Sequence, residues 1–152
     1  MSDYRVIVVP YDFSDHARVA LDEAAALARK MGGDVHLVHI LLSPIYTYSF
    51  AYAPEAAAVV PPIDMTEVRE SALKSLQELA AEIDVPGKVE AHVLEGASIS
   101  ETLREFVVNQ KGDLIVMGTH GRTGLAHAFL GSVAERTLRT APCPVLTVRA
   151  GD

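Results

Sequence analysis

Three glycines and one serine in the last third of the chain have the residue types and the spacing of a phosphate-binding loop. Residues 114–117 form an apolar run typical of a buried strand, and Gly118, Gly121 and Gly131-Ser132 follow in the pattern Gly-x2-Gly-x9-Gly-Ser. Glycine lets backbone N–H groups approach phosphate oxygens because it has no Cβ. Ser132 adds a hydroxyl and is expected to cap a helix, whose N-terminus attracts anions. The pattern predicts a phosphate site; the alternative is an ordinary connection with three turn glycines.

Two other phosphate-binding motifs are absent from the sequence. A Walker loop requires Gly-Lys followed by Ser or Thr, but the only Gly-Lys pair, Gly87-Lys88, is followed by Val89. The dinucleotide fingerprint requires Gly-x-Gly, which does not occur. Phosphate binding would therefore depend on the pattern that begins at Gly118.

Composition and charge narrow the class of protein. A chain of 152 residues is expected to form one domain, residues 1–152, with an ample core. The net charge of −7 argues against a nucleic-acid or anionic-membrane partner, so any anion site must be local. Cys143 is the only cysteine, which excludes an intramolecular disulfide. No signal-peptide pattern or long apolar run is evident, so a cytoplasmic location is expected.

Apolar periodicity predicts five strands that alternate with four helices. Strands are expected at 5–10, 35–41, 88–94, 114–117 and 145–149, and helices at 14–30, 66–83, 98–111 and 132–139. This alternation predicts an α/β protein with a parallel sheet covered by helices on both faces. Polar and apolar residues alternate along 88–94, which predicts a strand with one exposed face at a sheet edge. Asp12 and Gly118 would face one crevice if the first and fourth strands are neighbours, but the sequence alone does not fix the strand order.

The sequence also contains candidate N-cap residues for two helices and one long connection between elements. Asp12 or Ser14 can cap the first helix, and residues 98–101 (Ser-Ile-Ser-Glu) have the capping-box pattern. Residues 43–65 hold four prolines and three tyrosines, which predicts a mobile apolar loop with a short helix near 55–59. The alternative is a variable surface loop.

The motifs together resemble the universal stress protein family over nearly the whole chain. The resemblance is carried by the glycine pattern with Met117 and Val133, by residues 8–14 (Val-Val-Pro-Tyr-Asp-Phe-Ser), by 37–40 (Leu-Val-His-Ile) and by 142–148 (Pro-Cys-Pro-Val-Leu-Thr-Val). It implies an open Rossmann-like sheet of order 3-2-1-4-5. It also implies a homodimer that pairs strand Val145 to Val148 with its copy.

The resemblance further implies that the cofactor is ATP, with Mg²⁺ arriving on the nucleotide's phosphates. Asp12 and Ile40 would contact the adenosine, and Met117 would pack against the nucleotide. The implied binding set is Pro10, Tyr11, Asp12, Ile40, Met117, Gly118, His120, Gly121, Arg122, Gly131, Ser132 and Val133. One departure is Ser98, where the family often has proline.

Several of these residues have a simpler interpretation. Asp12 could serve only as a helix cap, Arg122 could be a solvated surface cation, and His120 could be a loop residue with a backbone partner. His36, His39 and His92 are interpreted as strand side chains. No predicted helix holds two histidines at the spacing of metal ligands, so no metal site is expected.

Three functions remain open at this stage. The first is an ATP-binding regulatory protein of the stress response, acting as a homodimeric nucleotide sensor. The second is a slow ATPase or adenylate-handling enzyme, against which no positioned general base and no loop lysine are recognisable. The third is a nucleotide-free dimerisation module, against which the intact glycines argue.

Overall fold

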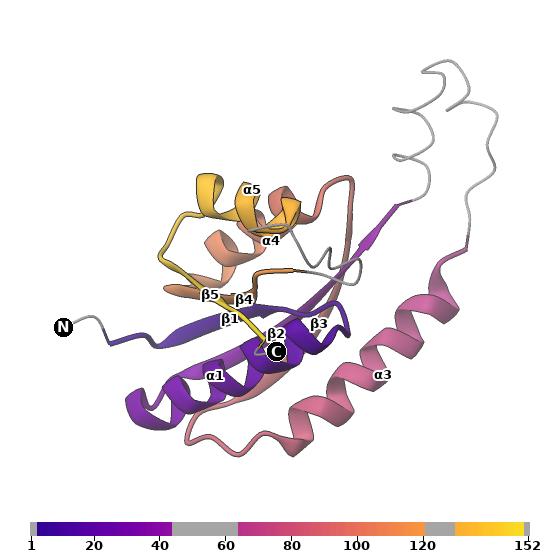
Figure 1. Ribbon diagram of the computed structural model, residues 1–152. Helices are drawn as coiled ribbons and strands as arrows, with labels where there is room; N and C mark the ends of the chain where they lie inside the picture. Colours follow the sequence, from indigo (N-terminus) through magenta and orange to yellow (C-terminus); the bar gives the residue numbers. More distant parts are fainter. Residues whose placement is uncertain (1–2, 44–63, 121–129, 151–152) are drawn as a thin grey trace.

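Strands and helices alternate along residues 3–43, 64–120 and 130–150, which the computed structural model describes (Figure 1). The elements are β1 (Val6–Pro10), α1 (Asp15–Met31), β2 (Asp34–Leu42), α3 (Thr66–Glu82), β3 (Val89–Gly96), α4 (Ile99–Gln110), β4 (Leu114–Gly118), α5 (Ser132–Thr140) and β5 (Val145–Val148). All nine expected elements are present, with ends shifted by one or two residues. The expected mobile loop lies outside the described residues except at its ends.

The five strands form one parallel sheet in the order β3-β2-β1-β4-β5. This confirms both the order that the resemblance implies and the edge position of strand β3. The chain builds the sheet in one direction from β1 to β3 and then in the other through β4 and β5. The reversal lies between β1 and β4, where Ile7 is opposite Leu114 and Val8 opposite Ile115. Ligands bind at such reversals, beyond the carboxyl ends of the strands.

Helices cover both faces of the sheet, as expected (Figure 1). Successive side chains of β1 point to opposite faces, so Ile7 and Val9 enter one core while Val8 enters the other. The first core lies under α1 and α3 and includes the fully buried Leu21 and Leu76. The second lies under α4 and α5. Apolar burial on two faces makes the sheet a rigid support for the connections at its carboxyl edge.

The helix α1 begins and ends as its sequence predicts. The Ser14 hydroxyl accepts a hydrogen bond from the Ala17 N–H at 3.1 Å, which identifies Ser14 as the cap. Gly32 ends the helix with φ of 72°, a conformation that glycine adopts without strain. The Asp12 carboxylate in turn accepts from the Ser14 N–H at 3.0 Å and from its hydroxyl at 2.5 Å.

Two other capping predictions are wrong. Ser98 is the N-cap residue of α4, but its side chain caps nothing and its hydroxyl instead lies 3.2 Å from that of Ser100. The N-cap of α5 is Gly131, in an extended conformation, so Ser132 is the first helical residue. A cap must be extended so that its side chain can reach back to the first turn, and Ser132 is already helical.

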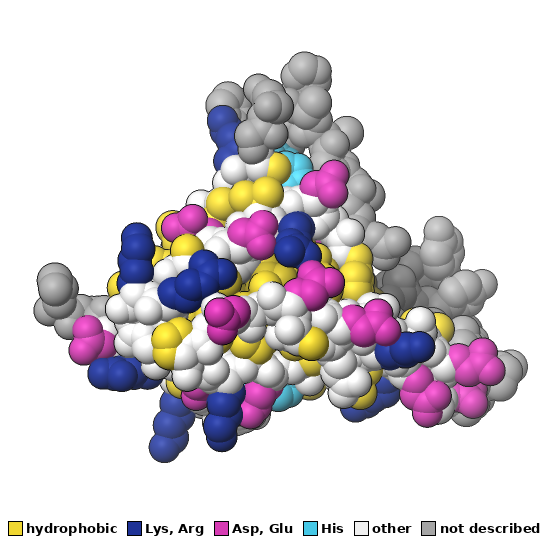
Figure 2. All heavy atoms as spheres, turned by 90° about the horizontal axis from the view of Figure 1, so that it is seen from below, with side chains coloured by type: hydrophobic (Ala, Val, Ile, Leu, Met, Phe, Trp, Pro, Cys, Tyr) yellow, Lys and Arg dark blue, Asp and Glu magenta, His cyan; other side chains and the backbone are white. Residues whose placement is uncertain are grey.

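The face covered by α1 and α3 carries acidic and basic side chains interspersed (Figure 2). Arg18 pairs with Asp22 at 3.2 Å and with Glu82 at 3.3 Å, and thereby links the two helices. This face therefore presents no continuous basic surface of the kind that binds nucleic acid. Among the described residues, no helix has the length and apolar character needed to cross a membrane.

Candidate functional site

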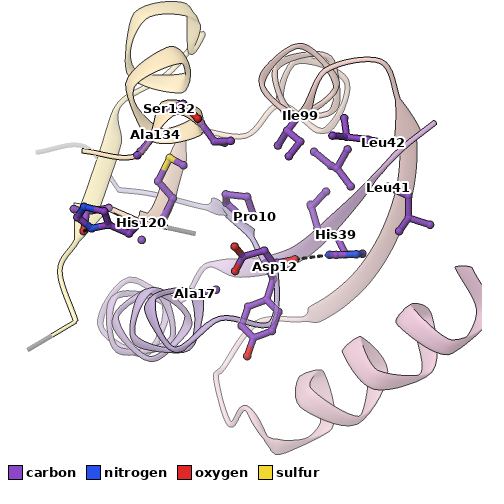
Figure 3. A pocket seen from close by; sticks show the side chains of 18 residues that line it. Pro10, Asp12, Ala17, His39, Leu41, Leu42, Ile99, His120, Ser132 and Ala134 are labelled. Carbon is purple, nitrogen blue, oxygen red and sulfur yellow. Dashed lines mark hydrogen bonds between the residues drawn. The ribbon is translucent and has the colours of Figure 1, made fainter. Parts of the chain in front are cut away.

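A cavity of about 440 Å³ lies at the carboxyl edge of the sheet, at the reversal between β1 and β4 (Figure 3). Its walls come from the ends of β1, β2 and β4, from the starts of α4 and α5, and from Ala17 of α1. The lining residues are Pro10, Tyr11, Asp12, Ala17, Val38, His39, Ile40, Leu41, Leu42, Ile99, Met117, Gly118, Thr119, His120, Gly131, Ser132, Val133 and Ala134. The volume is within the range of small-molecule sites.

Ten of the twelve residues expected at the site line this cavity. They are Pro10, Tyr11, Asp12, Ile40, Met117, Gly118, His120, Gly131, Ser132 and Val133. Gly121 and Arg122 lie outside the described residues. The structure thus brings segments that are more than 100 residues apart in sequence to one place; their role toward a ligand stays a prediction.

The turn after β1 holds Asp12 at the cavity. Phe13 has a φ of 64°, which is uncommon for a residue other than glycine and costs backbone strain. The strain is balanced by the bonds that Asp12 accepts from Ser14 and by edge-on packing of the Phe13 ring against Tyr11 and His39. Asp12 therefore braces the helix cap and lines the cavity at once, so the two interpretations of this residue are compatible.

His39 belongs to the cavity wall, although the sequence pattern predicts only that it lies in a strand. Its Nδ1 lies 2.7 Å from the Tyr11 carbonyl oxygen. Because a carbonyl can only accept, Nδ1 carries the hydrogen and donates it. The Tyr11 N–H donates to the Val38 carbonyl at 2.8 Å. Both backbone polar groups of Tyr11 are therefore hydrogen-bonded to β2, which holds the turn in place. Burial of Tyr11 raises the pKa of its hydroxyl, which is therefore neutral at pH 7.

The wall opposite the turn is apolar. Val38, Ile40 and Met117 are buried core residues whose side chains also line the cavity, together with Leu41 and Ile99. An apolar wall beside a single carboxylate suits a ligand with a flat, weakly polar part. Ile40 and Met117 are among the residues that the sequence analysis expects at the site. Val38 and Leu41 of β2 and Ile99 at the start of α4 are not, and they join the wall through the fold.

The residues at the start of α5 line the cavity and have N–H groups that no helical hydrogen bond uses. The Gly131 N–H already donates to the Thr119 carbonyl at 2.7 Å. The next three N–H groups, of Ser132, Val133 and Ala134, have no partner within the helix because they belong to its first turn. The N-cap residue Gly131 has no side chain with which to cap the helix, and all three residues line the cavity. The phosphate-binding groups would thus be helical amides, not the glycine amide that the loop pattern suggests at Gly131.

Gly118 is required by packing at the end of β4. A Cβ at this position would lie 2.8 Å from the His16 Cβ and 2.9 Å from the His16 carbonyl carbon and oxygen. Such distances are below van der Waals contact, and two of the three atoms are backbone. Glycine at 118 therefore lets α1 approach the sheet beside the cavity.

We expect Gly118→Ala to lower the free energy of unfolding by about 1–3 kcal/mol, because α1 must shift away from β4 to admit the methyl group. Urea denaturation followed by circular dichroism would measure the loss. A loss below about 0.5 kcal/mol would show that α1 moves freely, and that packing is not the reason for this glycine.

An open parallel sheet of order 3-2-1-4-5, with a crevice at the β1/β4 reversal, defines a Rossmann-like α/β protein. Residues 3–149 match the model of the Universal stress protein family. The chain belongs to this family.

Relatives and solved structures agree with this assignment. Universal stress protein MJ0531 of Methanocaldococcus jannaschii is 36% identical over 147 residues, which are 96% of this chain and 82% of the relative. The solved structure of MJ0577, from the same organism, has a TM-score of 0.79 at 26% identity and covers 99% of both chains. The universal stress protein of Archaeoglobus fulgidus in complex with dAMP has a TM-score of 0.61 at 25% identity, over 96% of this chain and 98% of that one.

Proposed function

We propose that this protein binds ATP, or another adenine nucleotide, in the cavity at the β1/β4 reversal and acts as a nucleotide-dependent regulator in the stress response. The observation that carries the proposal is that an apolar wall and the first turn of α5, whose amides no helical bond uses, lie in one cavity. The structure of a family member in complex with dAMP supports an adenine nucleotide as the ligand class.

The two ends of the cavity suit the two ends of a nucleotide. The adenine would pack on Val38, Ile40 and Met117, and the ribose hydroxyls would donate to the Asp12 carboxylate. The phosphates would accept hydrogen bonds from the first amides of α5, where the helix dipole adds favourable charge. Mg²⁺ would bind through the phosphates and water.

Calorimetric titration of the purified protein with ATP, ADP, AMP and inorganic triphosphate tests this proposal. We expect one site per chain for ATP, with weaker binding of AMP and of triphosphate because each fills half of the cavity. Release of ATP from protein denatured directly after purification would be independent support. If no adenine nucleotide binds at millimolar concentration, the proposal fails.

We further propose that two copies of the chain pair through β5. The strand is bonded to β4 on one side, with Ile115 opposite Val145 and Gly118 opposite Val148. Among the described residues no strand covers its other side. Leu146 is 37% exposed, and an open edge with an exposed apolar side chain is a template for pairing with another strand. An identical strand, antiparallel across a two-fold axis, would form hydrogen bonds with the backbone groups at this open edge.

Thr147→Pro is expected to convert the dimer to a monomer. The carbonyls of Pro144 and Val148 accept bonds from β4, so the backbone groups of Thr147, at the alternate position, point to the open edge. Proline there removes an edge donor without breaking a β4 bond. Light scattering would give the mass, and Val108→Lys, at an exposed apolar residue of α4, is the control that should stay dimeric. A dimeric Thr147→Pro protein would contradict the edge-strand interface.

A further inference from the structure

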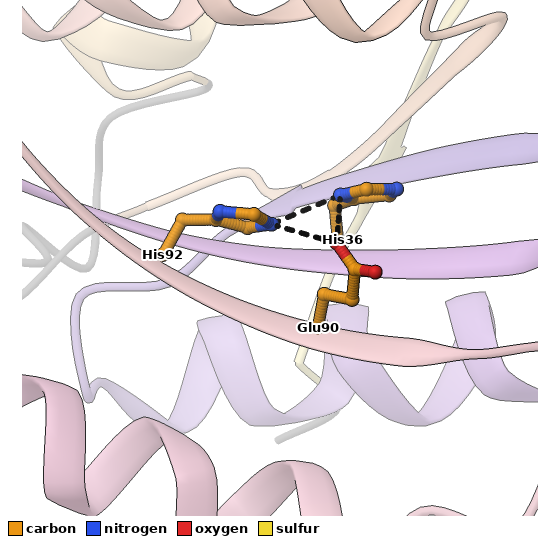
Figure 4. Close-up of side chains that lie close together, drawn as sticks. All are labelled: His36, Glu90 and His92. Atoms are coloured by element: carbon orange, nitrogen blue, oxygen red, sulfur yellow. Dashed lines mark hydrogen bonds and ion pairs between the residues drawn. The ribbon is translucent and has the colours of Figure 1, made fainter.

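We propose that His36, Glu90 and His92, on neighbouring strands β2 and β3, form a binding site for a divalent transition metal, with Zn²⁺ as the ion that fits the ligands (Figure 4). None of the three residues lines the cavity described above, and the proposal is independent of the nucleotide. It also differs from the expectation that the chain has no metal site.

The ligand atoms already lie at the spacing of a metal coordination shell. His36 Nδ1 is 3.0 Å from His92 Nε2 and 3.8 Å from a Glu90 carboxylate oxygen, and His92 Nε2 is 3.6 Å from the same oxygen. In a tetrahedral zinc site with bonds of about 2.0–2.1 Å, neighbouring ligand atoms are about 3.3 Å apart. Shifts of a few tenths of an ångström would therefore place all three atoms on one ion.

The sheet register holds the three side chains together. His36 is opposite Glu90, and His92 is opposite Val38, two residues along β2, so all three point to the face covered by α4. The Phe106 ring of α4 packs against both imidazoles, with ring centres 6.0 Å and 4.9 Å away. His36 is buried and His92 half-buried, so neither ring needs to be ordered on binding.

The chemistry of the cluster favours a metal over a simple hydrogen-bonded pair. Without a metal, two imidazole nitrogens 3.0 Å apart must share one proton, beside a carboxylate that only accepts. A metal ion replaces that proton and uses all three lone pairs. Two histidines and one glutamate are a known zinc ligand set, with the fourth position open to water, and the exposed Glu90 leaves such a position at the surface.

Titration of untagged, full-length, metal-stripped protein with Zn²⁺ tests the site, by competition with a chromophoric chelator. We expect one Zn²⁺ per chain, and a loss of affinity of about 100-fold in His92→Gln, since even outer-shell changes cost up to this much. Glu90→Gln should also weaken binding, by about 10-fold. Bound Co²⁺ should show the intense visible bands of a four-coordinate site in the wild type and not in His92→Gln.

A matched control is His39→Gln, which removes a histidine of β2, the strand that carries His36, from the opposite face of the sheet. It should leave the affinity for Zn²⁺ unchanged. Zn²⁺ at 100 times its Kd should also raise the thermal midpoint of the wild type by about 5 °C. The His92→Gln protein should unfold in a cooperative transition whose midpoint Zn²⁺ does not change. That result would show that the variant is folded and has lost the site. Equal affinity in the wild type and His92→Gln, or the absence of stoichiometric binding, would overturn the proposal.

Discussion

Replacing Ser132 with proline is expected to weaken ATP binding by about 10- to 100-fold while the protein stays folded. The change removes the first free amide of α5 from the cavity together with the serine hydroxyl. A hydrogen bond to a charged group contributes about 1.5–3 kcal/mol, and each 1.4 kcal/mol is a factor of ten in affinity. Calorimetric titration with ATP would measure the loss.

The fold should tolerate this substitution because Ser132 is the first residue of α5. Proline is favoured at this helix position, where its missing N–H breaks no helical bond. Gly131 has φ of −70° and ψ of 152°, which is the conformation that a residue before proline prefers. Thermal denaturation would verify that the variant is folded.

Ser132→Ala is the matched control, since it removes the hydroxyl and keeps the amide. The affinity ratio between the two variants isolates the contribution of the N–H group, and we expect it to reach about tenfold. Equal affinities for ATP in the proline and alanine variants would contradict the placement of the phosphates at α5.

The sequence was sufficient for the helices and strands, and it named ten of the residues that line the cavity. Continuous apolar runs such as residues 114–117 and the three-to-four spacing of residues 17–28 determine strand and helix directly, because burial follows these periods. The order of the strands is different. Alternation of strands and helices is compatible with several orders, and only the resemblance to the family distinguished the one that brings Asp12 beside Gly118.

The reasons for individual residues could not be obtained from local patterns. The glycine pattern predicts a phosphate-binding role for Gly118, and that role stays a prediction. The pattern does not contain its packing against His16, which comes close only after α1 packs on the sheet. Gly131 is extended with negative φ, so its conformation does not require glycine, and its amide is used by Thr119. The surroundings of both glycines are set by contacts between segments that are distant in sequence. A local sequence pattern does not contain such contacts.

The histidine cluster was missed for a related reason. A search for metal ligands at helical spacing compares residues three or four apart, whereas His36 and His92 are 56 positions apart. They meet because β3 pairs with β2 in one particular register, which sets Glu90 opposite His36. A sequence pattern could have found the cluster only after both the strand pairing and its register were known.

Asp12→Asn is expected to weaken ATP, ADP and AMP by a similar factor of about 10 to 100 and to leave inorganic triphosphate nearly unaffected. The carboxylate would accept charge-assisted bonds from the ribose hydroxyls, and asparagine loses the charge and one of the two acceptors. Asparagine keeps one side-chain oxygen, which can still accept from the Ser14 N–H and thereby preserve the turn. Calorimetric titration with the four ligands would measure the pattern.

Ser14→Ala separates the effect on the ligand from the effect on the helix cap. It removes the hydroxyl that caps α1 and bonds to Asp12, so we expect it to lower the free energy of unfolding by about 1 kcal/mol. The nucleotide affinities should change less than in Asp12→Asn, because the carboxylate remains at the cavity. If Asp12→Asn weakened triphosphate as strongly as AMP, the carboxylate would lie at the phosphate end, and the proposed orientation of the nucleotide would be reversed.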